Sequence, residues 1–319
     1  MARINDAKIV TVALSPAWDA VCSCADMKWG QHRTVDLISS HPAGKSLNIC
    51  RALDWMNAKS VAAGLWGSDD IKTAIADLKP LKNIKIAFTP ALGRTRQNIN
   101  LIDPATGREL HLRMPSPLAT TRSISALKKD LSQLIRPGDY VAFSGSMPTE
   151  YLDETIALIK SCRNKGGNII VDTSGKPLAA IVSTGSLKLI KPNLLELSEL
   201  LGVKILNNEK AIIKASRTLL DKVEMILVSR GSKGAMIITK EVVLSGRAVV
   251  DSAAAASSTL ACGDYLLAGF ISGLTQKQEL SNCLSLAIKC ATAKALDLIE
   301  YTWPKVAKKI KIEIVEVNQ

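Results

Sequence analysis

Residues 140–172 read YVAFSGSMPTEYLDETIALIKSCRNKGGNIIVD, and this stretch decides the fold class. Tyr140 to Phe143 and Asn168 to Asp172 are short apolar runs of the kind that form buried strands. Between them, Tyr151 to Cys162 carries apolar residues at helical spacing. A strand, a helix and a second strand in this order form the unit that builds a parallel sheet covered by helices.

The same alternation extends over most of the chain. Further strands are predicted at Lys8–Leu14, Ser60–Trp66, Leu187–Lys191, Met225–Ser229 and Ala235–Thr239. Further helices are predicted at Leu47–Met56, Ile124–Ile135, Glu209–Leu220 and, as the longest, Lys277–Ile299. Ile310 to Val317 alternates apolar and polar residues, which is typical of a half-exposed edge strand. The pattern predicts an α/β fold with a mostly parallel sheet.

Two segments interrupt the alternation, at about residues 20–42 and 93–113. Both are rich in β-type and turn residues, and Asp103-Pro104-Ala105-Thr106-Gly107 has the composition of a hairpin turn. We expect the two excursions to pair into a small sheet that lies over a site. No Ser/Gly-rich linker and no internal repeat divides the chain.

The composition is that of an ordinary globular protein, with 319 residues, 47% hydrophobic and 22% charged. The net charge of +12 is compatible with nucleic acid, a membrane surface or an anionic small substrate. The basic residues are spread along the chain, and only 4% of residues are aromatic, which argues against binding single strands by stacking. Seven cysteines without a CxxC pair or zinc spacing indicate buried thiols in a reducing compartment. We therefore expect a cytoplasmic protein.

Gly44-Lys45-Ser46 resembles the end of a phosphate-binding P-loop, but the motif needs a glycine where Ser39 stands. The segment also follows a predicted hairpin instead of a core strand, so we reject the P-loop interpretation. What remains is a flexible turn at a helix N-terminus, with Lys45 and Asn48 near its start. Such a turn can hold an anion or a sugar hydroxyl against backbone N–H groups.

Residues 257–270, SSTLACGDYLLAGF, lead from small polar residues into an apolar helix. The N–H groups of Ala261, Cys262 and Gly263 would then be first-turn donors without partners in the helix, and Asp264 would lie in the same turn. Considered alone, Asp264 fits a helix-capping acid better than a catalytic group.

Two further segments have both a structural and a functional interpretation. Asn193 and Glu196 have the spacing of a capping box, and they are also oxygen donors of the type that holds a hydrated magnesium ion. Residues 228–234, VSRGSKG, fit a hairpin between two core strands, and their glycines would also let the backbone approach a ligand.

The order and spacing of these segments resemble the PfkB/ribokinase-type carbohydrate kinases, in particular the 1-phosphofructokinase and tagatose-6-phosphate kinase branch. Eight collinear segments carry the resemblance, namely LSPAWD (14–19), PAGKSLNICRAL (42–53), GLWGSDD (64–70), GRTRQN (93–98), SGSMP (144–148), KPNLLEL (191–197), VSRGSKGA (228–235) and STLACGD (258–264). The resemblance implies a three-layer α/β/α fold in which residues 1–319 form a single ribokinase-like domain and the two excursions form a β-sheet lid.

The resemblance also implies roles for individual residues. Asp264 would be the general base, and the backbone of Ala261, Cys262 and Gly263 the anion hole for the transferring phosphoryl group. ATP would be the phosphoryl donor, with Mg²⁺ held by Asn193 and Glu196. The matching nucleotide positions are Lys191, Ser229, Gly231 and Gly234. The matching sugar positions are Asp19, Gly44, Lys45 and Asn48, and the matching phosphate positions are Arg96, Arg33 and Ser146.

The chain departs from the family pattern at several of these positions. GAGD is Ala261-Cys262-Gly263-Asp264, Ser15 replaces an asparagine, Ser46 replaces a glycine, and Tyr265 follows the acid. If position 261 requires a positive φ, alanine costs roughly 1 kcal/mol or more there. Cys262 at a helix N-terminus is predicted to have a lowered thiol pKa, which would make activity sensitive to oxidation.

The resulting hypothesis is an ATP- and magnesium-dependent kinase for a ketohexose phosphate, with fructose 1-phosphate converted to fructose 1,6-bisphosphate as the first choice. Tagatose 6-phosphate, fructose 6-phosphate and free fructose are alternative substrates. A catalytically weak sugar-phosphate-binding protein is the alternative outside enzymes, because of the altered GAGD motif. The expected partners are the sugar phosphate and ATP, with the lid as a candidate homodimer surface, and neither nucleic acid nor membrane is expected.

Overall fold

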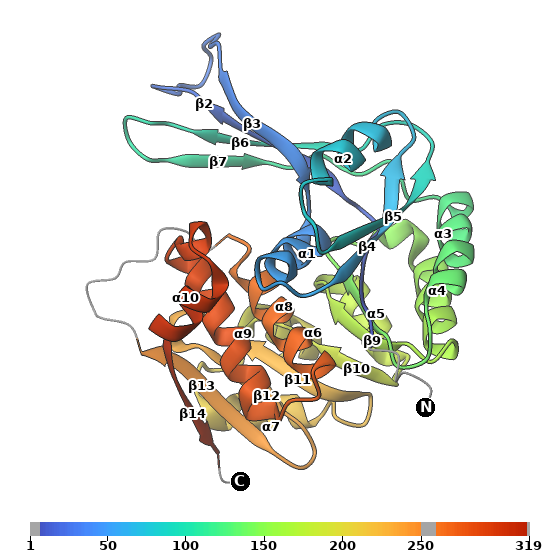
Figure 1. Ribbon diagram of the computed structural model, residues 1–319, viewed down its shortest axis with the longest axis vertical. Coiled ribbons are helices and arrows are strands. Elements are labelled where there is room, and N and C mark those ends of the chain that lie inside the picture. The colour runs from blue at the N-terminus through green and yellow to red at the C-terminus, as the bar shows by residue number, and fades with distance from the viewer. Residues whose placement is uncertain (1–6, 250–259, 318–319) are drawn as a thin grey trace.

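The computed structural model describes residues 7–249 and 260–317, which form a large sheet between helices and a smaller sheet beside it (Figure 1). The strand order of the large sheet is β14 (Lys311–Glu316), β13 (Val243–Val249), β12 (Ala235–Ile238), β11 (Val223–Ser229), β10 (Leu187–Ile190), β9 (Asn168–Asp172), β8 (Tyr140–Ser144), β1 (Ile9–Ala13), β4 (Ser60–Gly67) and β5 (Ile84–Ala91). The sheet is parallel from β5 to β11, and β12, β13 and β14 continue it antiparallel.

Helices cover both faces of the large sheet because its central strands are apolar on both sides. In β1, Val10 and Val12 join one buried cluster while Ile9 joins another on the opposite face. The first cluster is completed by α3 (Thr121–Leu134), α4 (Leu152–Asn164), α5 (Gly175–Ser183), α6 (Leu194–Leu201) and α7 (Glu209–Arg217). The second is completed by α1 (Lys45–Trp55), α8 (Cys262–Thr275) and α9 (Leu280–Ala295). The expected three-layer arrangement is confirmed.

The two excursions pair as expected. The small sheet has the order β3 (Asp36–Ala43), β2 (Ala17–Ser23), β6 (Gln97–Ile102) and β7 (Glu109–Leu112), and it projects beyond the large sheet (Figure 1). β2 and β6 join the excursions in parallel, with Trp18 opposite Gln97, and the other two pairings are antiparallel. The Gly107 N–H donates to the Asp103 carbonyl at 2.8 Å, which closes the predicted turn.

The predicted helix Lys277–Ile299 is wrong at both ends. Lys277 has φ 55° and its N–H bonds back to Leu274, so it belongs to the end of α8. α9 ends at Ala295, and Asp297 with φ 53° starts a separate turn, η3 (Leu298–Glu300). The prediction also missed β5 and β13, whereas β14 is the edge strand expected at the C-terminal end.

The remaining α-helices of the described residues are α2 (Ile71–Leu78) and α10 (Trp303–Lys309). Two short 3-10 helices are η1 (Thr149–Tyr151) and η2 (Gly231–Lys233). Within residues 7–249 and 260–317, no helix has the length and apolar character needed to cross a membrane.

Candidate active site

The sequence-predicted residues gather at one edge of the large sheet. Parallel strands present their carboxyl ends at the same edge, and ligands of open α/β sheets bind there. The segments that follow β8, β9, β10 and β11 meet at this edge, together with the first turns of α1 and α8. Ser46 Oγ fixes the start of α1 to the end of β8 by donating to the Ser144 carbonyl at 3.0 Å.

The centre of the site is a buried ion cluster around Asp172, the last residue of β9. Its Oδ1 lies 3.1 Å from Lys45 Nζ and 3.3 Å from Lys191 Nζ. Its Oδ2 is buried without a hydrogen-bond partner among the described residues. Burial opposes ionisation of this carboxyl, but the charges of Lys191 and Lys45 outweigh it and lower the pKa of Asp172.

Asp172 was missed as a site residue by the sequence prediction. The available signal was its position, since it is an acid at the carboxyl end of a predicted parallel strand.

Asp264 lies in the first turn of α8, 5% exposed, and faces the same cluster. Its Oδ2 accepts a hydrogen bond of 2.8 Å from Asn48 Nδ2. Burial, and next the negative charge of Asp172, raise the pKa of Asp264 to about 7, against the opposing effects of Asn48, Lys45 and Lys191. A carboxyl group with this pKa can accept a proton near neutral pH, as a general base must.

The N-terminus of α8 points into the cluster. A Cβ atom at Gly263 would lie 3.2 Å from Lys191 Nζ, so the backbone passes directly beside this ammonium group. The N–H groups of a first helical turn have no acceptor inside the helix, and they favour negative charge. Ser258 and Thr259 of the predicted motif lie outside the described residues.

Ala261 precedes α8 in the left-handed conformation, with φ 62° and ψ 0°. Its carbonyl accepts the N–H groups of Asp264 and Tyr265 at 2.9 and 3.0 Å. The position therefore has the positive φ on which the sequence argument depended. A left-handed alanine costs about 1 kcal/mol, which the contacts of α8 must offset.

The thiol of Cys262 does not have the predicted pKa. Burial, with a further contribution from the charge of Asp264, raises the pKa of Cys262 against the opposing effect of Lys294. The predicted lowering by the helix N-terminus is wrong because desolvation of the thiolate outweighs it. The raised pKa removes the argument for an unusually reactive thiol, and the oxidation sensitivity of the activity stays a prediction.

Asn193 and Glu196 form the capping box of α6. The Asn193 side chain accepts the Glu196 N–H and the Glu196 carboxylate accepts the Asn193 N–H, each at 2.8 Å. The charge of Glu196 nevertheless reaches the cluster. Burial disfavours the charged Lys45, but Asp172, Asp264 and Glu196 together raise the pKa of this lysine.

The remaining nucleotide positions lie along the ends of β10 and β11. The Ser229 N–H donates to the Pro192 carbonyl at 3.1 Å, which holds this strand end beside Asn193. Gly231 and Gly234 form the turn between β11 and β12, with φ 62° and 83°. A Cβ atom at Gly234 would lie 2.0 Å from the Gly246 carbonyl oxygen, so the hairpin alone requires glycine there.

Three of the predicted sugar and phosphate positions lie where the small sheet joins the large one. Asp19 accepts a hydrogen bond of 2.8 Å from Asn98, a residue to which the sequence analysis assigned no role. Gly44 caps α1 with φ 117°. The half-buried Arg96 has its pKa lowered by burial and by Arg113, although the charge of Asp19 partly opposes them.

Two predicted phosphate positions are not joined to the cluster by any contact of the described residues. Arg33 is exposed in the connection between β2 and β3, where its guanidinium donates to the Asp26 carbonyl at 3.2 Å. Ser146 is exposed in the segment after β8. Their roles stay predictions.

A buried carboxyl group of near-neutral pKa beside lysines and a helix N-terminus is an arrangement suited to phosphoryl transfer. Together with this fold, it defines the class as a small-molecule kinase. The sequence model of the pfkB family carbohydrate kinases matches residues 17–297. The chain belongs to the pfkB family and is an ATP-dependent sugar kinase.

Individual relatives agree with this family. The 1-phosphofructokinase of Bacillus subtilis is 28% identical over 293 residues, covering 90% of this chain and 92% of the relative. That of Borreliella burgdorferi is 32% identical over 259 residues, covering 79% and 80%. The ATP-dependent 6-phosphofructokinase isozyme 2 of Escherichia coli is 25% identical, covering 91% and 93%.

Solved structures confirm the fold. Phosphofructokinase-2 from Escherichia coli in complex with fructose-6-phosphate superposes with a TM-score of 0.84 at 23% identity, covering 94% of this chain and 99% of that one. A putative phosphofructokinase from Staphylococcus aureus gives a TM-score of 0.79 at 24% identity, covering 97% and 100%.

Proposed function

We propose that the chain transfers the γ-phosphoryl group of ATP to a ketohexose phosphate, with fructose 1-phosphate as the substrate and fructose 1,6-bisphosphate as the product. The observation that carries the proposal is the Asp264 carboxyl, buried beside Lys45 and Lys191 with a pKa of about 7. Asp264 takes the proton of the acceptor hydroxyl as that oxygen attacks the γ-phosphorus, and ADP leaves with the electrons of the broken P–O bond.

The two lysines and the first turn of α8 stabilise the charge of the transferring phosphoryl group in this mechanism. Asp172 holds both ammonium groups within 3.3 Å of one carboxylate oxygen, so they need little rearrangement during the reaction. Asn48 fixes the orientation of the Asp264 carboxyl through its 2.8 Å hydrogen bond. The backbone of residues 261–263 is the proposed anion hole.

Mg²⁺ is the proposed metal. The described residues contain no group of three or more His, Cys, Asp or Glu side chains that could hold an ion directly, so the residues present fit an ion that keeps most of its waters. The buried Asp172 Oδ2 lacks a partner among the described residues, and the Glu196 carboxylate acts on the same cluster. Carboxylate oxygens and waters are the ligands that Mg²⁺ prefers. When bound, the ion would neutralise phosphate charge. Asn193 and Glu196 would hold it through water, and Lys191, Ser229, Gly231 and Gly234 would line the nucleotide.

The substrate assignment depends on Arg96, the proposed contact for the phosphate of the sugar. Its guanidinium lies near Asp19, and Asp19 with Asn98 offers polar groups to sugar hydroxyls. Arginine binds phosphate well because its planar fork donates two parallel hydrogen bonds. Relatives named 1-phosphofructokinase favour fructose 1-phosphate. The relative named 6-phosphofructokinase keeps fructose 6-phosphate as an alternative, and tagatose 6-phosphate and free fructose complete the alternatives.

A coupled assay of ADP release tests the proposal with Mg-ATP and four acceptors, namely fructose 1-phosphate, fructose 6-phosphate, tagatose 6-phosphate and free fructose. We expect turnover to be highest with fructose 1-phosphate. A higher kcat/KM for another acceptor would refute the substrate assignment. Equal turnover of free fructose would refute the role of Arg96.

A sugar-phosphate-binding protein of weak activity is the second candidate, because Ala261 holds a left-handed conformation beside the proposed anion hole. Thermal stabilisation by a sugar phosphate, with no ADP release on any acceptor, would favour it over the kinase.

The small sheet is the proposed surface for a homodimer and the proposed lid of the site. It carries exposed apolar side chains, including Leu37 at 63% and Leu112 at 42% exposure. Sedimentation equilibrium of the wild type and of Leu37→Lys tests the proposal. We expect a dimer that the lysine weakens. A wild-type monomer at micromolar concentration would refute it.

A further inference from the structure

Asp70 stands at the N-cap of α2, but its side chain does not cap this helix. An aspartate at this position ordinarily accepts an N–H group of its own first turn. The Asp70 carboxylate instead accepts the Thr95 N–H at 3.2 Å, the Thr95 hydroxyl at 3.0 Å and the Trp18 indole N–H at 3.0 Å. Asp70 and Thr95 are each only 6% exposed.

Both partners of Asp70 belong to the base of the small sheet. Trp18 lies in β2, and Thr95 lies just before β6, so one carboxylate joins the two excursions to the large-sheet side of the molecule. The Gly67 N–H, at the end of β4, donates to the Thr95 hydroxyl at 2.9 Å. A Cβ atom at Gly67 would lie 2.5 Å from Thr95 N, so the two segments pass in close contact.

The residue after Thr95 is Arg96, whose guanidinium is held by backbone carbonyls. It donates to Ser15 at 3.0 Å, Pro16 at 3.3 Å and Met114 at 2.7 Å. The Arg96 carbonyl in turn accepts the Trp18 N–H at 2.8 Å. Asp70 therefore fixes the backbone immediately before the arginine and the indole ring of the strand beside it.

We propose that Asp70 is a positioning residue, which through Thr95 and Trp18 fixes the direction in which Arg96 meets the phosphate of the sugar. The inference rests on the proposed function, because Arg96 is the proposed phosphate contact. Three hydrogen bonds to one buried carboxylate hold this geometry, and bonds to a charged acceptor are stronger than neutral ones. Loss of these bonds leaves Asp264 and the proposed nucleotide residues in place, but it changes the direction in which the Arg96 guanidinium meets the phosphate of the sugar.

Steady-state kinetics of Asp70→Asn tests the proposal, with Asp69→Asn as the matched control. Asp69 is the exposed neighbour, and its carboxylate accepts only the Ser68 hydroxyl, at 3.1 Å, among the side-chain donors of the described chain. We expect KM for fructose 1-phosphate to rise about tenfold in Asp70→Asn, while KM for ATP and kcat stay near wild type. Asp69→Asn should match the wild type.

Substitutions of Thr95 separate positioning from folding. Thr95→Val removes the hydroxyl and should raise KM for fructose 1-phosphate. Thr95→Ser keeps the hydroxyl, so its KM for fructose 1-phosphate should stay near the wild-type value. If Asp70→Asn does not fold, the two Thr95 variants still test whether the hydrogen bonds of Thr95 position Arg96. A fall in kcat with unchanged sugar-phosphate KM, or equal effects of Thr95→Val and Thr95→Ser, would overturn the proposal.

A readout without turnover keeps this inference separate from the proposed function. If the wild type phosphorylates no sugar phosphate, the proposed function fails on its own. Amide hydrogen exchange at Thr95 and at Trp18 should still be faster in Asp70→Asn than in Asp69→Asn. Equal exchange in the two variants would show that Asp70 does not position this segment.

Discussion

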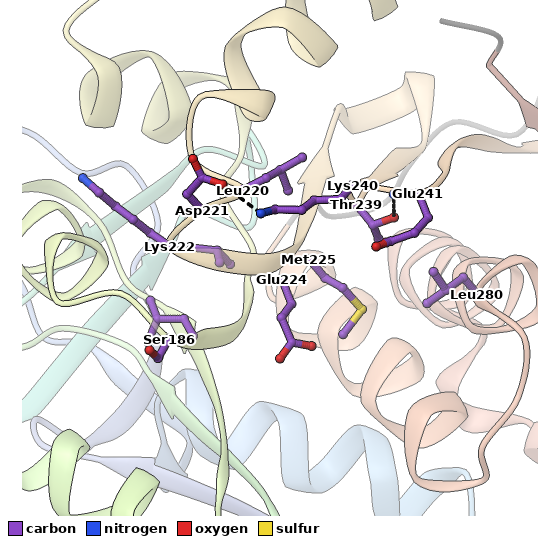
Figure 2. A pocket seen from close by; sticks show the side chains of 12 residues that line it. Ser186, Leu220, Asp221, Lys222, Glu224, Met225, Thr239, Lys240, Glu241 and Leu280 are labelled. Carbon is purple, nitrogen blue, oxygen red and sulfur yellow. Dashed lines mark hydrogen bonds and ion pairs between the residues drawn. The ribbon is translucent and has the colours of Figure 1, made fainter.

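The two edges of the large sheet both carry charged side chains, but they arrange them differently. At the amino edge, a hollow of about 540 Å³ is lined by residues including Leu220, Asp221, Glu224 and Lys240 (Figure 2). Its ion pair of Lys240 with Asp221, 2.8 Å apart, is exposed to solvent. At the carboxyl edge, the carboxylate of Asp172 is buried and shared by two lysines.

The difference shows how burial changes the chemistry of similar charged groups. Water screens the exposed pair at the amino edge, and exposed ion pairs contribute little to the free energy of unfolding. At the carboxyl edge, burial of the Asp264 carboxyl, and next the negative charge of Asp172, raise the pKa of Asp264 to about 7 although Lys45 and Lys191 oppose the shift. One buried oxygen of Asp172 has no hydrogen-bond partner among the described residues.

The largest expected effect is that of Asp264→Asn at the carboxyl edge. The amide cannot accept the proton of the acceptor hydroxyl, so we expect kcat to fall about a thousandfold. ATP and sugar-phosphate binding, measured by calorimetry, should change little because the amide is similar in shape. The matched control at the amino edge is Asp221→Asn, and comparable losses in both variants would refute the difference between the edges.

Asp172→Asn should affect both stability and pH dependence. Removing one partner of a buried ion cluster costs about 3 kcal/mol of unfolding free energy, measurable by urea denaturation.

Asp264 must be deprotonated to act as a base, so kcat/KM of the wild type should rise with pH through about 7 and then level off. Without the negative charge of Asp172 the pKa of Asp264 falls, and this rise should move to lower pH. An unmoved rise would contradict the coupling.

Ala261→Gly should stabilise the protein by about 1 kcal/mol, because glycine adopts the left-handed conformation without the steric cost of a Cβ atom. The melting temperature would measure the change. Ala157→Gly, at an exposed position inside α4, is the matched control and should have the opposite sign. Destabilisation in both variants would mean that Ala261 is not strained.

The smallest expected effect is that of Lys240→Ala at the amino edge. This side chain pairs with Asp221 in solvent, so kcat, KM and the melting temperature should equal those of the wild type. A tenfold loss of turnover would show that the hollow of Figure 2 takes part in the reaction.

The strands were predicted well where both faces of the sheet are buried. Asn168–Asp172 forms a strand with the predicted bounds, because a strand covered on both sides is a continuous apolar run. The long C-terminal helix was predicted with the wrong ends because Lys277 and Asp297 take positive φ values there. Neither position is a glycine, which is the residue that usually indicates such a conformation in a sequence. Half-exposed β5 lacks the buried run on which the prediction depended.

Site residues were predicted from the sequence where they belong to one of the segments that resemble the family. Lys45, Asn48 and Asp264 belong to such segments, and the structure brings them together. Asp172 carries no local motif, and its contact with Lys45 joins residues 127 positions apart. The Cys262 prediction considered the helix N-terminus alone, whereas burial of the thiol depends on the packing around it.

The parallel pairing of β2 with β6 also constrains how the chain is assembled during synthesis. The ribosome releases β2 and β3 first, and these antiparallel neighbours can pair at once. The other edge of β2 must wait until Gln97–Ile102 has emerged. Until then its unpaired backbone groups can add a strand from another nascent chain. We therefore expect pauses in translation before residue 102 has emerged from the ribosome to increase aggregation of newly made chains, while later pauses should have little effect.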